Sequence, residues 1–200
     1  TRGRPGEVVT ILDRRGRFLA RGIASDGSIA VRILTTLDEA VDEAFFRRRI
    51  DTAAALRDRV VPPDTDAYRL LHGEGDRLAG VVCDVYGAAA VLRFDGDAIA
   101  HHRAAIVRAL TPVLEARGVR TLLEKTGRGP SAMVNTVVGR PPERVAVREH
   151  GMTLIADLAH GQKTGLFLDH RESRKMVRSL ARGLRVLNLY GYTGGFSVAA

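Results

Sequence analysis

Apolar and polar residues alternate between residues 7 and 34, and turn-forming residues interrupt the alternation. The alternating runs cover residues 8–12, 18–23 and 29–34, separated by Asp13-Arg14-Arg15-Gly16 and by Ser25-Asp26-Gly27-Ser28. A period of two places successive side chains on opposite faces of a strand. The pattern predicts three short strands joined as a meander.

Residues 38–60 change to a helical period, with apolar side chains three or four positions apart and arginines filling the positions between them. Pro62-Pro63 is expected to end this helix. The arginines could contact RNA phosphates, but charge on the polar face of an amphipathic helix usually serves solvation. Solvation is the favoured interpretation.

A second β-region is predicted over residues 68–94, as strand, turn, strand. Gly73 and Gly75 lie in its turn, but their spacing fits neither the dinucleotide fingerprint nor the P-loop. We therefore assign them a structural role. Cys83 lies within an apolar run, where a cysteine behaves as a small hydrophobic residue rather than a nucleophile.

The next predicted elements are a helix, a strand, a loop and a hairpin. The helix covers 97–117, with Asp97 as its cap and Gly118 as its stop. A strand follows over 119–125, and the Gly- and Pro-rich passage 126–142 is interpreted as a loop or hinge. Residues 144–150 and 152–158 are expected to pair about Gly151. The neighbouring histidines His101 and His102 lack the i, i+4 spacing of a chelating pair on a helix.

The last fifty residues contain the candidate chemistry. The glycine-rich approach 161–171 leads into a helix predicted over 171–182, followed by an apolar run at 184–189 and by Gly191, Gly194 and Gly195. A short apolar run is typical of a parallel strand buried on both faces, and a helix is expected to begin at Phe196. Together these elements indicate the first strand-loop-helix of a doubly wound sheet, where cofactors lie against the loop. A nicotinamide-type turn is not favoured, because Gly-x-Gly-x-x-Gly is absent.

Two motifs in this region resemble a known family. Asn188 to Phe196 reads Asn-x-x-Gly-x-Thr-Gly-Gly-Phe, and Lys163 to Arg171 reads Lys-Thr-Gly-x-x-Leu-Asp-x-Arg. The pair is similar to class I S-adenosylmethionine-dependent methyltransferases that act on cytosine C5 of 23S rRNA. The resemblance implies an α/β fold with an α+β N-terminal part. It divides the chain into a small PUA-like RNA-binding β-barrel at 1–36, a central α+β domain at 37–150, and the start of a Rossmann-like methyltransferase domain at 151–200.

The same resemblance implies S-adenosylmethionine as cofactor and names the residues expected near it. Gly194 and Gly195 would let the backbone approach the cofactor, and Asn188 stands where many methyltransferases place Asp. Asp169 has an alternative role as the N-cap of the following helix, and both roles can hold. The candidate cofactor-binding residues are Lys163, Thr164, Gly165, Asp169, Arg171, Asn188, Tyr190, Gly191, Tyr192, Thr193, Gly194, Gly195 and Phe196. No catalytic or metal-binding residue is assigned, because the family's catalytic motifs are expected beyond Ala200.

The charge, the cysteine content and the length of the apolar runs indicate which partners and which cellular setting to expect. The 200 residues carry 31 Lys and Arg against 23 Asp and Glu, a formal net charge of +8, which favours an acidic partner such as ribosomal RNA. The single cysteine excludes an intrachain disulfide and fits a reducing, cytoplasmic setting. No apolar run reaches the length of a membrane span. A homodimer is left open, and a non-catalytic RNA-binding module is the alternative function.

One expectation concerns the C-terminal segment itself. A lone strand and one turn of helix cannot cover both faces of a parallel sheet, so residues 184–200 are expected to be poorly held in this chain.

Overall fold

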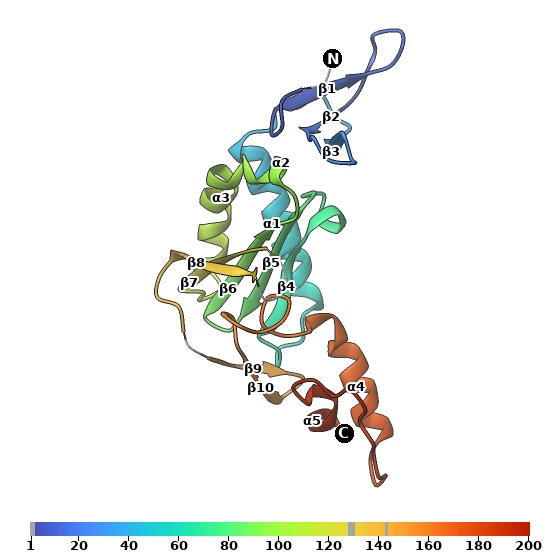
Figure 1. Cartoon of the computed structure of the whole chain (residues 1–200), viewed down its shortest axis with the longest axis vertical. Coiled ribbons are helices and arrows are strands. Elements are labelled where there is room, and N and C mark those ends of the chain that lie inside the picture. The colour runs from blue at the N-terminus through green and yellow to red at the C-terminus, as the bar shows by residue number, and fades with distance from the viewer. Residues whose placement is uncertain (1–2, 128–130, 143) are drawn as a thin grey trace.

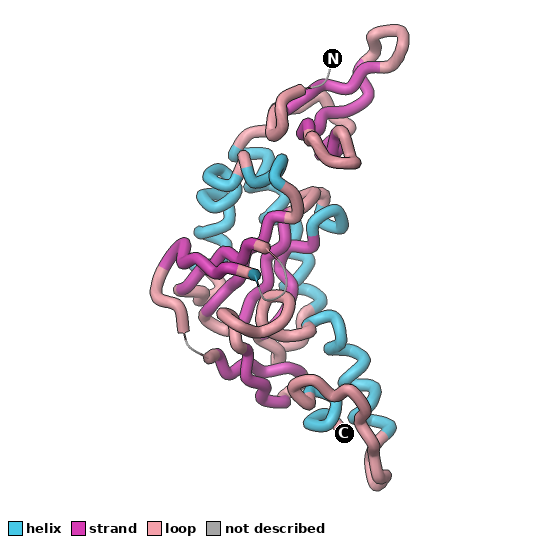
Figure 2. The backbone as a smooth tube through the Cα atoms, in the orientation of Figure 1, coloured by secondary structure: helices cyan, strands magenta, loops and turns pink. Residues whose placement is uncertain are grey.

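The computed structural model describes residues 3–127, 131–142 and 144–200. The molecule is elongated, with a small sheet at the N-terminal end, a central sheet covered by helices, and a hairpin with two helices at the C-terminal end (Figure 1). Strands and helices are concentrated in the middle, whereas loops make up much of the C-terminal end (Figure 2).

The N-terminal sheet has the predicted meander. Its strands are β1 (Val8–Leu12), β2 (Phe18–Ala24) and β3 (Val31–Thr35), paired antiparallel in the order β1-β2-β3. Polar contacts link this N-terminal part to the central part of the chain. Arg32 of β3 donates to Glu74 Oε1 at 2.7 Å, and the ring Nε2 of His102 donates to the carbonyl of Gly6, just before β1, at 2.9 Å.

The central sheet has five strands in sequential order: β4 (Ala67–His72), β5 (Val81–Tyr86), β6 (Ala89–Phe94), β7 (Thr121–Thr126) and β8 (Met133–Val138). Among the described strands, only β6 and β7 pair in parallel, because a helical crossover joins them. The turn between β4 and β5 contains the short 3₁₀ helix η1 (Gly73–Asp76). The predicted strand-turn-strand is confirmed.

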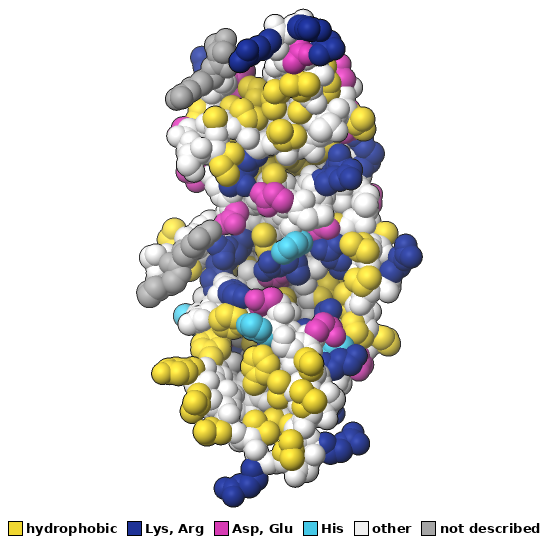
Figure 3. All heavy atoms as spheres, turned by 90° about the vertical axis from the view of Figure 1, so that its right-hand side faces the viewer, with side chains coloured by type: hydrophobic (Ala, Val, Ile, Leu, Met, Phe, Trp, Pro, Cys, Tyr) yellow, Lys and Arg dark blue, Asp and Glu magenta, His cyan; other side chains and the backbone are white. Residues whose placement is uncertain are grey.

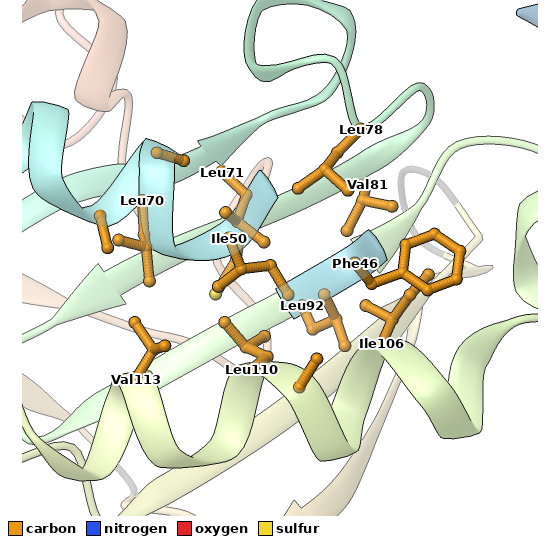
Figure 4. Packing of buried hydrophobic residues seen from close by; sticks show 14 of the residues in the cluster. Phe46, Ile50, Leu70, Leu71, Leu78, Val81, Leu92, Ile106, Leu110 and Val113 are labelled. Atoms are coloured by element: carbon orange, nitrogen blue, oxygen red, sulfur yellow. The ribbon is translucent and has the colours of Figure 1, made fainter. Parts of the chain in front are cut away.

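The two faces of this sheet bury different clusters. Ala90 and Leu92 of β6 face α1 (Glu43–Val60) and α3 (Arg103–Glu115), with Ile50 and Leu110 between the layers (Figure 4). Alternate residues such as Val91 face the other way, toward a smaller cluster supplied by the C-terminal hairpin and the loop after it. The strand alternation thus directs one face to the helices and the other to the segment that carries the candidate site.

Two helix boundaries differ from those predicted. Helix α1 begins at Glu43 rather than at residue 38, because Asp42 is the N-cap and accepts a hydrogen bond from the backbone N–H of Phe45 at 2.9 Å. It ends at Val60, before the two prolines as expected. The helix predicted over 97–117 is two helices, α2 (Asp97–Ala100) and α3, which are separated at His101 and His102. Gly96 occupies the cap position, so the assignment of Asp97 as cap was wrong.

The passage 126–142 is not simply a loop or hinge. Met133–Val138 forms β8 and pairs antiparallel with β7, because the edge of β7 offers hydrogen-bonding groups that no local pattern shows. Gly127 and Gly139 lie on either side of β8 with positive φ angles. The glycines that suggested a loop therefore flank an edge strand.

The hairpin follows prediction. Strands β9 (Val145–Glu149) and β10 (Met152–Ala156) pair antiparallel about His150 and Gly151, whose φ angles of 46° and 74° make the tight turn. The loop 157–167 leads to η3 (Leu168–His170) and to α4 (Arg171–Leu180), which is shorter than the predicted 171–182.

Residues 184–189 do not form the predicted strand. They belong to none of the sheets among the described residues, and Leu184, Leu187 and Leu189 are largely exposed. A strand needs a neighbour to take its backbone hydrogen bonds, and no described strand lies alongside this run. The chain then turns into α5 (Gly195–Ala199). Residues 184–189 are exposed as expected, but Ala199 of α5 is buried, so the expectation that all of residues 184–200 are poorly held stays a prediction.

Candidate cofactor site

A cavity of about 610 Å³ lies between the hairpin strand β10, the loop before η3 and the glycine-rich segment. Its walls come from four separate stretches of chain: residues Thr153, Leu154 and Ile155; Leu166, Phe167 and His170; Arg174; and Asn188–Thr193 with Gly195, Phe196 and Val198. Apolar side chains gather over this end of the molecule, whereas charged side chains and histidines mix across its middle (Figure 3). Both the volume and the largely apolar walls are typical of a small-molecule site.

Aromatic rings form much of the wall. The ring of Phe167 lies 6.0 Å from His170, nearly parallel, and 5.5 Å from Tyr192, edge to face. His170 in turn lies 5.7 Å from Phe196. Such rings offer flat apolar surfaces against which a planar heterocycle can stack.

Every second residue from 190 to 194 in the glycine-rich segment has a positive φ angle. Tyr190, Tyr192 and Gly194 have φ angles of 56°, 48° and 78°, which only glycine adopts without cost. Within this segment the side-chain amide of Asn188 donates to Ser197 Oγ at 2.9 Å. A Cβ at Gly191 would lie 2.9 Å from Asn188 Nδ2, so this glycine allows the close approach of the asparagine.

A buried ion pair supports the cavity. Arg174 of α4 donates from Nε to Glu149 Oε1 at 2.6 Å and from a terminal nitrogen to Glu149 Oε2 at 2.5 Å. The same terminal nitrogen donates to the carbonyl of Phe167 at 3.0 Å, and the guanidinium lies 6.0 Å from the Phe196 ring. Arg174 thus ties β9, the loop and α5 together. Its position in a run of basic residues gave no sign of burial, so sequence reasoning missed it.

The thirteen candidate residues divide into two groups. Seven line the cavity: Asn188, Tyr190, Gly191, Tyr192, Thr193, Gly195 and Phe196. The other six do not. Thr164 is buried against the central sheet, and Arg171 bonds to Glu172. A Cβ at Gly165 would lie 2.7 Å from Leu158 Cδ2, and one at Gly194 would meet open space.

Lys163 and Asp169 form a pair of their own beside the cavity. Lys163 Nζ lies 2.8 and 2.9 Å from the Asp169 carboxylate oxygens and 4.3 Å from the centre of the Phe167 ring. Burial raises the pKa of Asp169, but the hydrogen bond and charge of Lys163, a backbone hydrogen bond and the nearby His170 together outweigh it and hold that pKa below its usual value. The alternative role of Asp169 as N-cap of α4 is wrong, because His170 occupies that position and no side chain caps the helix.

Comparison with known proteins places the chain in a family. The profile of the S-adenosylmethionine-dependent methyltransferases matches residues 95–200, more than half of the chain. The chain belongs to the S-adenosylmethionine-dependent methyltransferase family. A PUA-like domain profile matches residues 1–36, and these two matches confirm the predicted fold class and cofactor.

Curated relatives of the chain agree with the family match. Ribosomal RNA large subunit methyltransferase I of Shigella dysenteriae serotype 1 is 39% identical over 202 residues, covering 98% of this chain and 51% of the relative. The protein of the same name from Escherichia coli O139:H28 is 38% identical with the same coverage. The chain therefore spans about half the length of the curated relatives it matches.

Two of the solved structures that match share the fold of this chain. The crystal structure of SMU.776, a methyltransferase complexed with SAH, matches with a TM-score of 0.87 at 27% identity, covering 98% of this chain and 51% of that one. A SAM-dependent methyltransferase from Streptococcus mutans matches with a TM-score of 0.83 at 25% identity, covering 98% and 52%.

The residues of the cavity fit the cofactor of the family. Its volume suits a nucleoside with an amino-acid tail, its rings suit adenine, and Asn188 and the backbone of residues 190–193 supply polar groups. The hairpin residues Thr153, Leu154 and Ile155 complete the wall, and sequence reasoning missed them because a hairpin pattern does not show what its exposed side faces.

Three further observations concern the described residues. Cys83 is fully buried in β5, and burial raises the pKa of its thiol, so it has the structural role expected of it. The described residues contain no cluster of three or more His, Cys, Asp or Glu side chains placed to hold a metal ion. Of the helices in those residues, none combines the length and apolar character that crossing a bilayer requires.

Proposed function

We propose that the protein carrying this chain transfers a methyl group from S-adenosylmethionine to ribosomal RNA, at C5 of a cytosine in 23S rRNA. The observation that carries the proposal is the 39% identity, over 98% of the chain, to an enzyme named ribosomal RNA large subunit methyltransferase I. The formal net charge of +8 supports an RNA substrate, because a basic protein attracts the phosphate backbone.

The cavity is the proposed cofactor site. When bound there, S-adenosylmethionine supplies an electrophilic methyl group. Asn188, Tyr190, Gly191, Tyr192, Thr193, Gly195 and Phe196 line the cavity and are proposed to contact the cofactor directly. We propose that Lys163, Thr164, Gly165, Asp169, Arg171 and Gly194 act from beside it, by fixing the loops that form its walls.

Methylation at cytosine C5 uses a thiolate that adds to the base, and this chain offers no cysteine for that role. Its single cysteine, Cys83, is buried on β5 with a raised thiol pKa. The proposal therefore assigns cofactor binding to this chain and assigns no catalytic residue within it.

The remaining parts of the proposal concern organisation. We propose that residues 1–36 contact RNA, that 37–150 form a central domain, and that 151–200 begin the methyltransferase domain. A cytoplasmic location follows from the ribosomal substrate. A homodimer stays a prediction, which the molar mass measured by light scattering would test.

A methyl-transfer assay on the whole protein tests the function. Radiolabelled S-adenosylmethionine and 23S rRNA stripped of its modifications should give labelled RNA, and mass spectrometry of its nucleosides should find 5-methylcytidine. Phe196→Ala should lower the affinity for S-adenosylhomocysteine, because it removes a ring from the cavity wall. Met133→Ala on the exposed edge of β8 is the matched control.

Two results would overturn the proposal. RNA binding without methyl transfer would favour the non-catalytic RNA-binding module instead. Methyl transfer to protein or small molecules only would show that RNA is not the substrate, although the protein would still be a methyltransferase.

A further inference from the structure

Buried polar groups attach the loop 157–167 to the central sheet. The hydroxyl of Thr164 donates to Asp84 Oδ2 at 2.6 Å, although the two residues are 80 positions apart in the chain. Both are almost fully buried. Asp84 also accepts from Arg69 at 2.8 and 3.0 Å, so its two oxygens are held by a guanidinium and a hydroxyl together.

Tyr86 extends this chain of hydrogen bonds. Its hydroxyl lies 2.8 Å from Thr164 Oγ1 and accepts from the backbone N–H of Leu166 at 3.3 Å. A carboxylate accepts only, so the proton of Thr164 points to Asp84 and Tyr86 must donate to Thr164. Burial raises the pKa of the Tyr86 hydroxyl, which keeps this donor protonated. The direction of each hydrogen bond in the series is therefore fixed.

A lysine fixes the beginning of the same loop. Lys125 of β7 is buried, and its Nζ donates to the carbonyl of Gly161 at 2.7 Å. Burial, followed by the nearby Arg93, lowers the pKa of Lys125. Gly161 has no room for a side chain, since a Cβ there would collide with the carbonyl of Asp157.

The opposite face of the loop forms the cavity. Leu166 and Phe167, two and three positions after the anchored Thr164, line it. The backbone N–H of Gln162 donates to the Tyr192 hydroxyl at 3.2 Å, and Tyr192 packs edge to face on Phe167. One loop thus joins the central sheet to the glycine-rich segment.

We propose that Asp84, Tyr86 and Lys125 of the central sheet are positioning residues for the cofactor cavity, acting through Thr164 and Gly161. The inference rests on the proposed function, because it takes the cavity as the S-adenosylmethionine site. It gives Thr164, a residue of the Lys-Thr-Gly motif, the role of an anchor rather than of a cofactor contact. Losing this anchor loosens Leu166 and Phe167, and the cofactor then has to order them when it binds.

The test measures S-adenosylhomocysteine binding by calorimetry in the whole protein. Thr164→Val keeps the shape of the side chain and removes its hydroxyl, and Tyr86→Phe removes a single oxygen. Each should raise the dissociation constant about threefold to tenfold, the equivalent of one buried hydrogen bond. Thr164→Ser should restore the wild-type value. Amide hydrogen exchange at Gly165 and Leu166 should become faster by a similar factor.

Thr121→Val is the matched control. Thr121 is also buried on the central sheet, and its hydroxyl donates to the carbonyl of Arg140 at 2.9 Å, away from the cavity. It should lower the melting temperature as Thr164→Val does and leave binding unchanged. If Thr164→Val does not fold, Tyr86→Phe carries the test.

The outcomes separate this inference from the proposed function. Unchanged binding and unchanged exchange in Thr164→Val and Tyr86→Phe, in a protein whose binding Phe196→Ala weakens, would overturn the inference alone. No binding by the wild-type protein would overturn the cofactor site. In that case, amide hydrogen exchange at Leu166 still tests the anchoring role. An unchanged rate in Thr164→Val and Tyr86→Phe would overturn that role, and a faster rate would support it.

Discussion

Strand β6 and the segment 184–189 are both short apolar runs, yet they differ in structure. In β6, Val91 and Leu92 are completely buried, with β5 on one side, β7 on the other, and a layer on each face. In the C-terminal segment, Leu187 is 81% exposed and pairs with no described strand. The same local pattern therefore gives a core strand in one place and an unpaired coil in the other.

An apolar run by itself therefore does not specify a strand. The backbone of a strand must give its hydrogen bonds to neighbours, and its side chains must find layers to pack on. The central sheet supplies both within the described residues. The segment 184–189 has the glycine-rich turn and α5 after it, but it has neither a paired strand nor a covering layer.

The largest expected effect contrasts two leucines. Leu110→Ala, in the completely buried interior between α3 and the sheet, should lower the free energy of unfolding of this chain by about 2–5 kcal/mol. Leu187→Ala should change it by less than about 0.5 kcal/mol, because that side chain is already in water. Urea denaturation of the two variants measures both values. A loss above about 1 kcal/mol in Leu187→Ala would show that residues 184–189 are packed in solution.

The next effect concerns the glycine-rich turn. Gly194→Val forces a branched side chain to adopt a φ of 78°, which costs about 1–3 kcal/mol of local strain, and should abolish S-adenosylhomocysteine binding in the whole protein. Gly183→Val is the control, because Gly183 has a φ of 74° and its Cβ would also meet open space. Calorimetry should show binding by the Gly183 variant only. Equal affinity in both would place the cofactor at another loop.

The smallest effect is a pH dependence of the ion pair beside the cavity. The pKa of Asp169 is lower in the folded chain than in the unfolded one, so its pair with Lys163 stabilises the fold above the ordinary carboxyl pKa. This stabilisation is lost as the pH falls below about 4, through the lowered pKa. It should amount to at most about 1 kcal/mol, since both side chains are partly exposed.

Denaturation curves between about pH 2 and pH 6 measure this dependence. Asp169→Asn and Lys163→Met should each remove the same part of the pH profile, and the double variant should remove no more than either alone. A profile that the two variants leave unchanged would mean that the pair does not form.

The sequence alone determined the elements whose formation depends on neighbouring residues. The alternation at 8–34, the turn at Gly151 and the glycines at 191–195 specify local backbone geometry, and the motif pair with Lys163 and Asn188 led to the methyltransferase family that the comparisons show. These features were readable because period, turn chemistry and motif spacing act over a few residues.

The contacts between these elements are visible only in the tertiary structure. The sequence did not show that Met133–Val138 would find the edge of β7, that Arg174 would be buried on Glu149, or that Thr164 would bond to Asp84. It also could not show that the run 184–189 would lack a partner strand. The contacts Arg174–Glu149 and Thr164–Asp84 join residues 25 and 80 positions apart, and the energy of such a contact depends on burial and hydrogen bonding that only the packed fold creates.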